Sequence, residues 1–193
     1  AAASLGMVNG IGAPDPNPPA LSPQSARAAP LAAQDPVALD GFVLGYVPEG
    51  LRHDAHDSVY TAPVGEAGLG DDRATPVAGE PSVTVTLRRF TAPPAPGSVM
   101  WVTVLRPSTH AGSEVETERI QGWLLDWADV ADAERVPVAV GEAYLVAPPS
   151  GATQGTGSRV VIAAATGEMI LVEGSSQALS AGELRRVAEG LTR

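Results

Sequence analysis

The residues of this chain best suited to chemistry lie in one short segment, HDAHD, at residues 53–57. His53 and His56 are three positions apart, and each is followed directly by an aspartate. Imidazole nitrogens and carboxylate oxygens bind zinc and other divalent ions, so the pair is a candidate metal site. A structural zinc site uses four ligands, however, and no third histidine lies nearby. The pattern therefore favours a solvated polar loop, and an enzyme or metal-binding protein that uses His53 to Asp57 is the alternative hypothesis.

Other arrangements point to chemistry less strongly. Ser58 beside His56 and Asp57 supplies the residue types of a catalytic triad, but residues so close in sequence rarely converge in that geometry. Asp71 and Asp72 are adjacent in a Gly- and Pro-rich stretch, whereas calcium needs more oxygen ligands at regular spacing. The G-x-S-x-G, S-x-x-K and H-E-x-x-H motifs are absent from the sequence. We therefore predict no catalytic residue, no cofactor-binding residue and no metal ligand, and a protein that is not an enzyme.

Composition limits the classes of partner. Of the 193 residues 44% are hydrophobic, which is enough for a packed core. The net charge is −10, and the twelve basic residues, all of them arginine, form no basic run. Since nucleic acids are bound through clustered Lys and Arg, we predict that the protein binds no nucleic acid. Cysteine is absent, which excludes disulfides and thiolate-bound zinc, and no run reaches the roughly 20 apolar residues of a membrane helix.

A proline-rich stretch precedes the elements that would position these residues. Residues 1–39 contain seven prolines among many alanines and show no apolar periodicity, so neither a helix nor a strand ladder forms easily there. We predict a flexible tail or linker at residues 1–39 and a single α+β domain at residues 40–193. The tail is a spacer between a membrane anchor and the domain, a disordered terminus without a role, or a segment that lies along the domain.

Period-two alternation and apolar runs predict the strands of an antiparallel sheet. The run SVTVTLRRF at residues 82–90 alternates strictly, which indicates one buried face and one solvated face. The run VMWVTVLR at residues 99–106 is apolar on both faces, so we predict a central strand that is covered on both sides. Thr166-Gly167 separates two apolar runs and predicts a tight hairpin turn. Further strands are predicted at residues 40–47 and 58–62, and a strand pair at 136–146.

Two helices complete the predicted fold. Ser113 with Glu116, and Ser180 with Glu183, have the S-x-x-E spacing of a capping box, in which two side chains satisfy backbone N–H groups at a helix start. The helices are predicted at residues 113–130 and 180–191. Both carry an apolar stripe at helical spacing, so we expect them to cover the same sheet. The side chains expected to be buried there are Trp123, Trp127, Leu184, Val187 and Leu191.

The two ends of the predicted domain resemble a known family. GFVLGYVPEGL at residues 41–51 resembles the entry of extracytoplasmic domains of actinobacterial anti-sigma factors and lipoproteins. VVIAAATGEMILVEGSSQALSAGELRRVAEGL at residues 160–191 is similar to their closing hairpin and helix. Those domains are related in fold to the outer-membrane lipoprotein carrier and to periplasmic sigma-regulator proteins. The resemblance implies an α+β fold, a mainly antiparallel curved sheet covered by two amphipathic helices, and brings no catalytic residue with it.

We therefore predict a non-enzymatic extracytoplasmic module of a bacterial cell-envelope or secreted protein, which binds an apolar ligand or an envelope protein. The ligand would enter between helix and sheet, where the small residues Ala128, Ala131 and Ala188 leave room; alternatively, these residues only let the helices pack closely. A structural adaptor in an envelope complex is the third hypothesis. The chain opens AAASLGMVNG without the pattern of a signal peptide, so a membrane tether would come from a segment before residue 1.

Overall fold

A computed structural model describes residues 29–32, 38–53, 55–70, 79–94, 98–108, 114–148, 156–175 and 179–193. The strands are β1 (Ala29–Ala32), β2 (Ala38–Leu39), β3 (Phe42–Leu44), β4 (Arg52–His53), β5 (His56–Gly65), β6 (Gly68–Leu69), β7 (Ser82–Thr91), β8 (Ser98–Ser108), β9 (Glu134–Val138), β10 (Gly141–Val146), β11 (Thr156–Ala164), β12 (Met169–Ser175) and β13 (Leu191–Thr192). The helices are α1 (Glu114–Trp127) and α2 (Ala181–Glu189).

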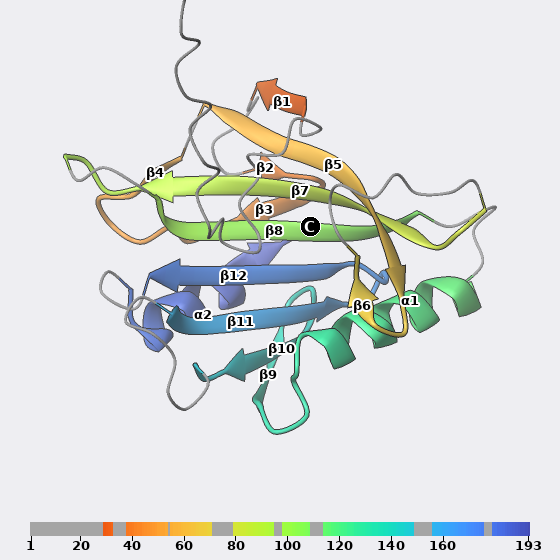
Figure 1. Cartoon of the computed structure of the whole chain (residues 1–193). Helices are drawn as coiled ribbons and strands as arrows, with labels where there is room; N and C mark the ends of the chain where they lie inside the picture. Colours follow the sequence, from red (N-terminus) through yellow and green to blue (C-terminus); the bar gives the residue numbers. More distant parts are fainter. Residues whose placement is uncertain are drawn as a thin grey trace, which may run out of the picture.

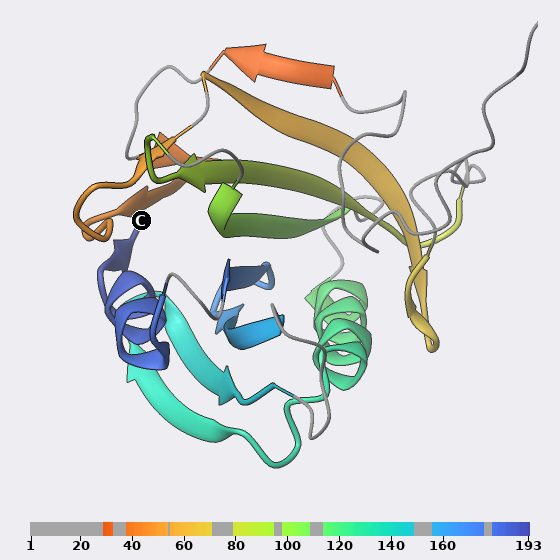
Figure 2. The ribbon, with the colours of Figure 1, turned by 60° about the vertical axis from the view of Figure 1, so that its left-hand side comes forward.

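One large antiparallel sheet forms most of the molecule (Figure 1). Its strands follow the order β1-β5-β7-β8-β12-β11-β10-β9, with β4 paired to β7 and β6 paired to β5. A small sheet of order β13-β3-β2 accompanies it. Figure 2 shows that the large sheet is strongly curved. The predicted α+β class and the mainly antiparallel curved sheet are therefore confirmed.

The central strands are apolar on both faces. Successive side chains of a strand point to opposite faces of its sheet. In β12, Ile170 and Val172 belong to one buried hydrophobic cluster, whereas Met169 and Leu171 belong to another. Strand β8 also contributes to both clusters, with Met100, Val102 and Val104 in the first and Leu105 in the second. The central position predicted for residues 99–106 is therefore confirmed, whereas on the second face the coverage is only partial, because Trp101 is partly exposed.

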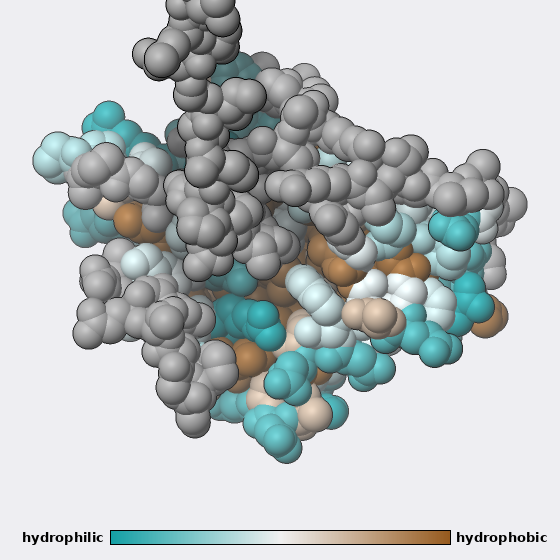
Figure 3. Space-filling view, viewed as in Figure 1, coloured by the Kyte–Doolittle hydropathy of each residue, from teal (hydrophilic) through white to brown (hydrophobic). Residues whose placement is uncertain are grey.

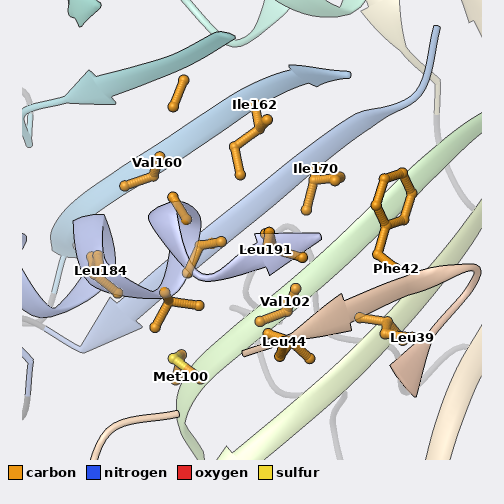
Figure 4. Packing of buried hydrophobic residues seen from close by; sticks show 14 of the residues in the cluster. Leu39, Phe42, Leu44, Met100, Val102, Val160, Ile162, Ile170, Leu184 and Leu191 are labelled. Atoms are coloured by element: carbon orange, nitrogen blue, oxygen red, sulfur yellow. The ribbon is translucent and has the colours of Figure 1, made fainter. Parts of the chain in front are cut away.

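Helix α2 and the small sheet pack on the first face. Figure 4 shows the cluster on this face, in which strands of the large sheet, strands of the small sheet and α2 all contribute side chains: Leu39, Phe42, Leu44, Met100, Val102, Val160, Ile162, Ile170, Leu184 and Leu191. Gly174 of β12 permits the close approach of the helix, since a Cβ there would lie only 3.1 Å from Leu184 Cδ2. The first face is thus closed by side chains from both ends of the domain.

Helix α1 packs on the second face. Its buried residues Ile120 and Leu124, with Ala128 just after the helix, join Leu105 of β8 and Val161 of β11 in the second cluster. Figure 2 shows α1 and α2 on opposite sides of strands β11 and β12. The strands between them are therefore the middle layer of the molecule.

The predicted helix boundaries and burial are correct in part. The Ser180 capping box is present: the Ser180 N–H donates to Glu183 Oε2 (3.0 Å) and the Glu183 N–H donates to Ser180 Oγ (3.2 Å). Leu184, Val187 and Leu191 are buried as predicted, although Leu191 belongs to β13 rather than to the helix. Ser113, the first residue of the other capping box, lies outside the described residues.

The prediction that both tryptophans of α1 are buried is wrong. Trp123 and Trp127 are only partly buried, because Ile120, Leu124 and Ala128 occupy the stripe that faces the sheet. These three residues are spaced by four positions, and the tryptophans are one position out of that stripe. Ala131, expected to leave room for a ligand, lies beyond the helix and is exposed.

Two expectations about the amino-terminal half also need correction. The strand predicted at residues 40–47 is present only at Phe42–Leu44, as β3, and it forms a small hairpin with β2 in which Asp40 and Gly41 make the turn. Leu39 is buried in the core, and β1 pairs with β5, so packed structure already occurs within the stretch assigned to the tail. Neither Leu39 nor the four-residue strand β1 could be predicted from hydrophobic periodicity, because the pattern needs a longer run of residues to be recognised.

The solvated face predicted for residues 82–90 is also wrong. Thr86 and Arg88, which alternate with the apolar residues of β7, are both buried. The reason lies in the neighbouring strand, since β5 supplies Asp57 as a partner for Arg88. Alternation reports which residue types share a face, whereas only the tertiary fold decides whether a polar face is covered.

Candidate functional site

The structure removes Asp57 from the candidate metal site. Arg88 of β7 donates two hydrogen bonds to its carboxylate, from Nε to Oδ1 and from Nη2 to Oδ2, both 2.7 Å long. The Arg88 side chain is only 2% exposed, so this ion pair lies inside the protein. A carboxylate with both oxygens held by one guanidinium is committed to structure rather than to a metal ion or to proton transfer.

The two histidines of the segment 53–57 do not converge on a metal site. His53 of β4 lies edge-on to Phe90, with ring centroids 6.4 Å apart and 71° between the ring planes. His56 begins β5 and is exposed. Among the residues that the structure describes, no group of three or more His, Cys, Asp or Glu side chains is placed to hold a metal ion. Three residues weighed for chemistry from the sequence lie outside the described ranges: Asp54, Asp71 and Asp72.

Strand geometry also separates the residues of the possible triad. Asp57 and Ser58 are consecutive in β5, so their side chains point to opposite faces of the sheet. A serine nucleophile and its orienting carboxylate must meet on the same histidine. This arrangement does not bring them together.

A second buried carboxylate, Glu168, is the centre of a hydrogen-bond cluster that includes the C-terminal residue. It accepts hydrogen bonds from Arg106, from Thr166 and, at 2.7 Å, from Arg193. Arg106 also donates to the Asp40 carboxylate (3.2 Å) and to its main-chain carbonyl (2.7 Å). Burial alone would raise the pKa of Glu168, but the hydrogen bond from Thr166 and the two arginines outweigh it, so its pKa is lowered. The cluster joins the β2–β3 turn, the β11–β12 hairpin and the C-terminus, which is a structural role.

One row of charged and aromatic residues crosses four neighbouring strands. Arg159 of β11 lies opposite Glu173 of β12, Glu173 lies opposite Trp101 of β8, and Trp101 lies opposite Arg89 of β7. Residues that lie opposite each other in a sheet point to the same face. This is the second face, because Leu171, two positions before Glu173, belongs to the cluster beneath α1. We call these four residues the polar row.

Helix α1 leaves the polar row uncovered. The row lies near the end of β12 and near the beginnings of β8 and β11, which Figure 1 shows on the left, whereas α1 lies at the right-hand ends of these strands. Among the described residues of the row, Arg159 contacts the end of α1, because its side chain donates a hydrogen bond to the main-chain oxygen of Ala128, directly after the helix. From the same side, Figure 3 shows hydrophilic residues along the outer side of α1 and hydrophobic residues between the helix and the strands.

Glu173 is the residue of the row with the most unusual environment. Burial raises the pKa of its carboxyl group, and the charge of Arg159 only partly opposes that effect. Within the described ranges no hydrogen bond and no ion pair engages the carboxylate. Arg159 instead donates from Nη2 to the main-chain oxygen of Ala128, just after α1. A half-buried acid with a shifted pKa and no direct partner is a candidate binding residue.

Thr103 adds a second unsatisfied group to the same region. It lies two positions after Trp101 in β8, on the same face, and is only 5% exposed. Its Oγ1 is buried and has no hydrogen-bond partner among the described residues. A buried polar group without a partner costs about 1–3 kcal/mol, so its persistence calls for a physical explanation. Trp101, which neighbours Glu173 across the strands and Thr103 along β8, is partly exposed.

The sequence carried a signal for this site that periodicity analysis assigned to the core. Arg159 precedes the apolar run of β11, Glu173 ends the apolar run of β12, and Trp101 lies within β8. From the sequence, Trp101 is better explained as a core residue than as a platform for a ligand, and Arg159 and Glu173 only flank apolar runs. The register that aligns them across four strands follows from the tertiary fold.

Neither helix of the described chain combines the length and apolar character needed to cross a membrane. No protein-family model, no curated protein and no solved structure matches this chain.

Proposed function

We propose that this domain is a non-enzymatic, extracytoplasmic binding module, and that it binds its partner at the polar row. In this proposal the two helices cover opposite faces of the sheet, and α1 leaves half of the second face for the partner. The observation that carries the proposal is Glu173, a half-buried carboxylate that accepts no hydrogen bond from the part of the chain that the structure describes and that lies beside the partly exposed Trp101.

Binding is favoured over catalysis because the other buried carboxylates are already engaged. Arg88 holds both oxygens of Asp57, and Glu168 accepts hydrogen bonds from two arginines and a threonine. Catalytic acids and bases need a proton-transfer partner within hydrogen-bond reach. In the described ranges, Glu173 has a tryptophan and an arginine as its cross-strand neighbours, which suits recognition better than proton transfer.

We place the proposed binding surface away from the helix–sheet interfaces, where an apolar ligand was expected to enter. Ala128 and Ala188, expected to leave room for an apolar ligand, are fully buried within the two clusters. They let the helical segments approach the sheet closely, which was the alternative interpretation. An acidic group and a hydroxyl at the proposed surface also suit a polar partner better than a lipid, because an apolar ligand would leave both without hydrogen bonds.

The extracytoplasmic location is part of the proposal. It is supported by the absence of cysteine and by the resemblance of residues 41–51 and 160–191 to extracytoplasmic domains of actinobacterial anti-sigma factors and lipoproteins. The same resemblance implies a module without catalytic residues. An envelope protein is therefore the proposed class of partner.

A fragment screen by NMR tests the binding surface directly. The 15N-labelled full chain is titrated with a mixture of small acidic, basic, neutral polar and apolar fragments. We expect saturable shifts to cluster at Trp101, Thr103 and Glu173, with the indole N–H of Trp101 among them. A Trp101→Leu variant should lose these shifts, whereas Trp123→Leu, at the partly buried Trp123 of α1, should retain them. Saturable shifts confined to other surfaces, or none for any fragment, would reject the proposal.

A further inference from the structure

We infer that the polar row recognises an arginine side chain of a partner protein, with the guanidinium stacked on Trp101 and donating hydrogen bonds to Glu173 and Thr103. This inference rests on the proposed function and names its ligand class. Three observations carry it: a carboxylate and a hydroxyl that have no hydrogen-bond partner among the described residues, and the partly exposed indole that neighbours both.

The unsatisfied groups of the site call for a ligand rich in donors. Ionised Glu173 is an acceptor only, and the hydroxyl of Thr103 accepts hydrogen bonds as well as donating one. A guanidinium has five N–H donors and no acceptor, so one group satisfies both residues. A carboxylate or phosphate ligand would add a further acceptor beside Glu173, and burial next to it would be repulsive.

Geometry makes a planar cation suitable. Glu173 and Trp101 lie opposite each other on adjacent strands, which are about 4.8 Å apart. Thr103 is two positions from Trp101 along β8, opposite Leu171, and is therefore diagonal to Glu173. A guanidinium lying flat on the indole thus has a carboxylate beside one edge and a hydroxyl beside another. Cations on tryptophan faces are stabilised by about 0.5–2 kcal/mol, and arginine is the more frequent partner.

The protein uses the same contact elsewhere in its fold. Arg119 stacks over Trp123 with Cζ 5.0 Å from the ring centroid. Arg193 lies 5.3 Å over Phe42. Trp101 makes no such contact within the described ranges, although Arg159 and Arg89 belong to the same row. Of the three rings Trp123, Phe42 and Trp101, only that of Trp101 has no arginine stacked on it within the described ranges.

Charge complementarity supports the same occupant. The chain carries a net charge of −10, so its long-range field attracts basic partners and repels acidic ones. Arg159 does not neutralise Glu173 directly, because it donates to the Ala128 carbonyl. Arg89 lies on the far side of Trp101 from Glu173. An incoming guanidinium at Glu173 would provide the ion pair that the carboxylate lacks.

Peptides that differ in one group test this inference. The full chain, 15N-labelled, is titrated at low salt with acetyl-Ala-Arg-Ala-amide and with three analogues that carry citrulline, lysine or glutamate in place of arginine. Citrulline has nearly the shape of arginine without its charge. We expect saturable shifts at Trp101, Thr103 and Glu173 with the arginine peptide, at least tenfold weaker binding of citrulline and glutamate peptides, and weaker binding of the lysine peptide.

Conservative variants separate recognition from folding. Glu173→Gln and Thr103→Val keep the shape of the residue, and each should weaken binding of the arginine peptide at least threefold while the remaining spectrum is unchanged. Glu118→Gln removes one negative charge from the exposed side of α1 and serves as the charge-matched control, with unchanged binding.

The outcomes distinguish the inference from the proposed function. If the citrulline, lysine or glutamate peptide binds the polar row as tightly as the arginine peptide, the guanidinium inference is wrong but the binding surface stands. If the arginine peptide causes only unsaturable shifts spread over acidic residues, the inference is wrong as well. If neither the peptides nor the fragment mixture shift the polar row, both the inference and the proposed function fail.

Discussion

Truncating Leu184 tests whether α2 closes the core of this domain. The side chain is 1% exposed, and Leu184→Ala removes three carbon atoms. At about 0.8 kcal/mol for each buried methylene, the transfer term alone is about 2.4 kcal/mol. The site collapses poorly, because Gly174 opposite Leu184 has no side chain to move into the gap. The cavity term therefore adds to the transfer term, and we expect a loss of about 2–5 kcal/mol in the free energy of unfolding.

The assay is equilibrium unfolding in urea, followed by far-UV circular dichroism. Val115→Ala is the matched control, since Val115 is 76% exposed on α1 and its truncation should change the free energy of unfolding by less than about 0.5 kcal/mol. A loss below about 1 kcal/mol for Leu184→Ala would show that α2 is peripheral and would refute the arrangement described here.

A double variant tests the two-faced arrangement itself. Ile120 of α1 is fully buried on the second face, and Ile120→Val should cost about 0.5–1.5 kcal/mol. Leu184 belongs to the first face, so the two side chains share no cluster. The double variant should therefore lose the sum of the two single losses to within about 0.5 kcal/mol. A coupling above about 1 kcal/mol would mean that the helices share one core.

Three further perturbations follow from single contacts. Gly68 has φ +90°, and a Cβ there would overlap the side chain of Trp127. Gly68→Ala should therefore lower the free energy of unfolding by about 1–3 kcal/mol, as measured in urea. An unchanged urea midpoint would mean that the β5–β6 hairpin does not pack on α1. Ser180→Ala removes the capping box with Glu183 and should cost about 1 kcal/mol, whereas Ser180→Asp should restore most of the loss. Burial raises the pKa of Glu173, so its contribution to stability is fully present below the ordinary pKa of glutamate and is lost as pH rises through the raised value. Glu173→Gln should therefore unfold at higher urea than the parent protein at neutral pH but not at acidic pH, and equal midpoints at neutral pH would show that burial does not disfavour the carboxylate.

Local structure could be predicted from the sequence where one short segment contains all the residues that determine it. The hairpin at Thr166-Gly167 and the capping box at Ser180 were predicted correctly because a turn and a helix start depend on neighbours in sequence. The continuous apolar run likewise predicted the central position of the strand at residues 99–106, because a strand with apolar residues on both faces is placed inside a sheet rather than at its edge.

The candidate site was not readable from the sequence because its members come from four strands. Arg159, Glu173, Trp101 and Arg89 become neighbours only when β11, β12, β8 and β7 pair in one register. The segment 53–57, by contrast, was a candidate site in the sequence and is not one in the structure. Its Asp57 carboxylate accepts two hydrogen bonds from Arg88 of β7 and is buried in the core. Residue types and their local spacing follow from the chain alone, whereas pairing, burial and the absence of a partner depend on distant strands. The sequence thus determined most of the strands and helices, and the tertiary structure decided which polar side chains of the described ranges are paired by hydrogen bonds and which are not.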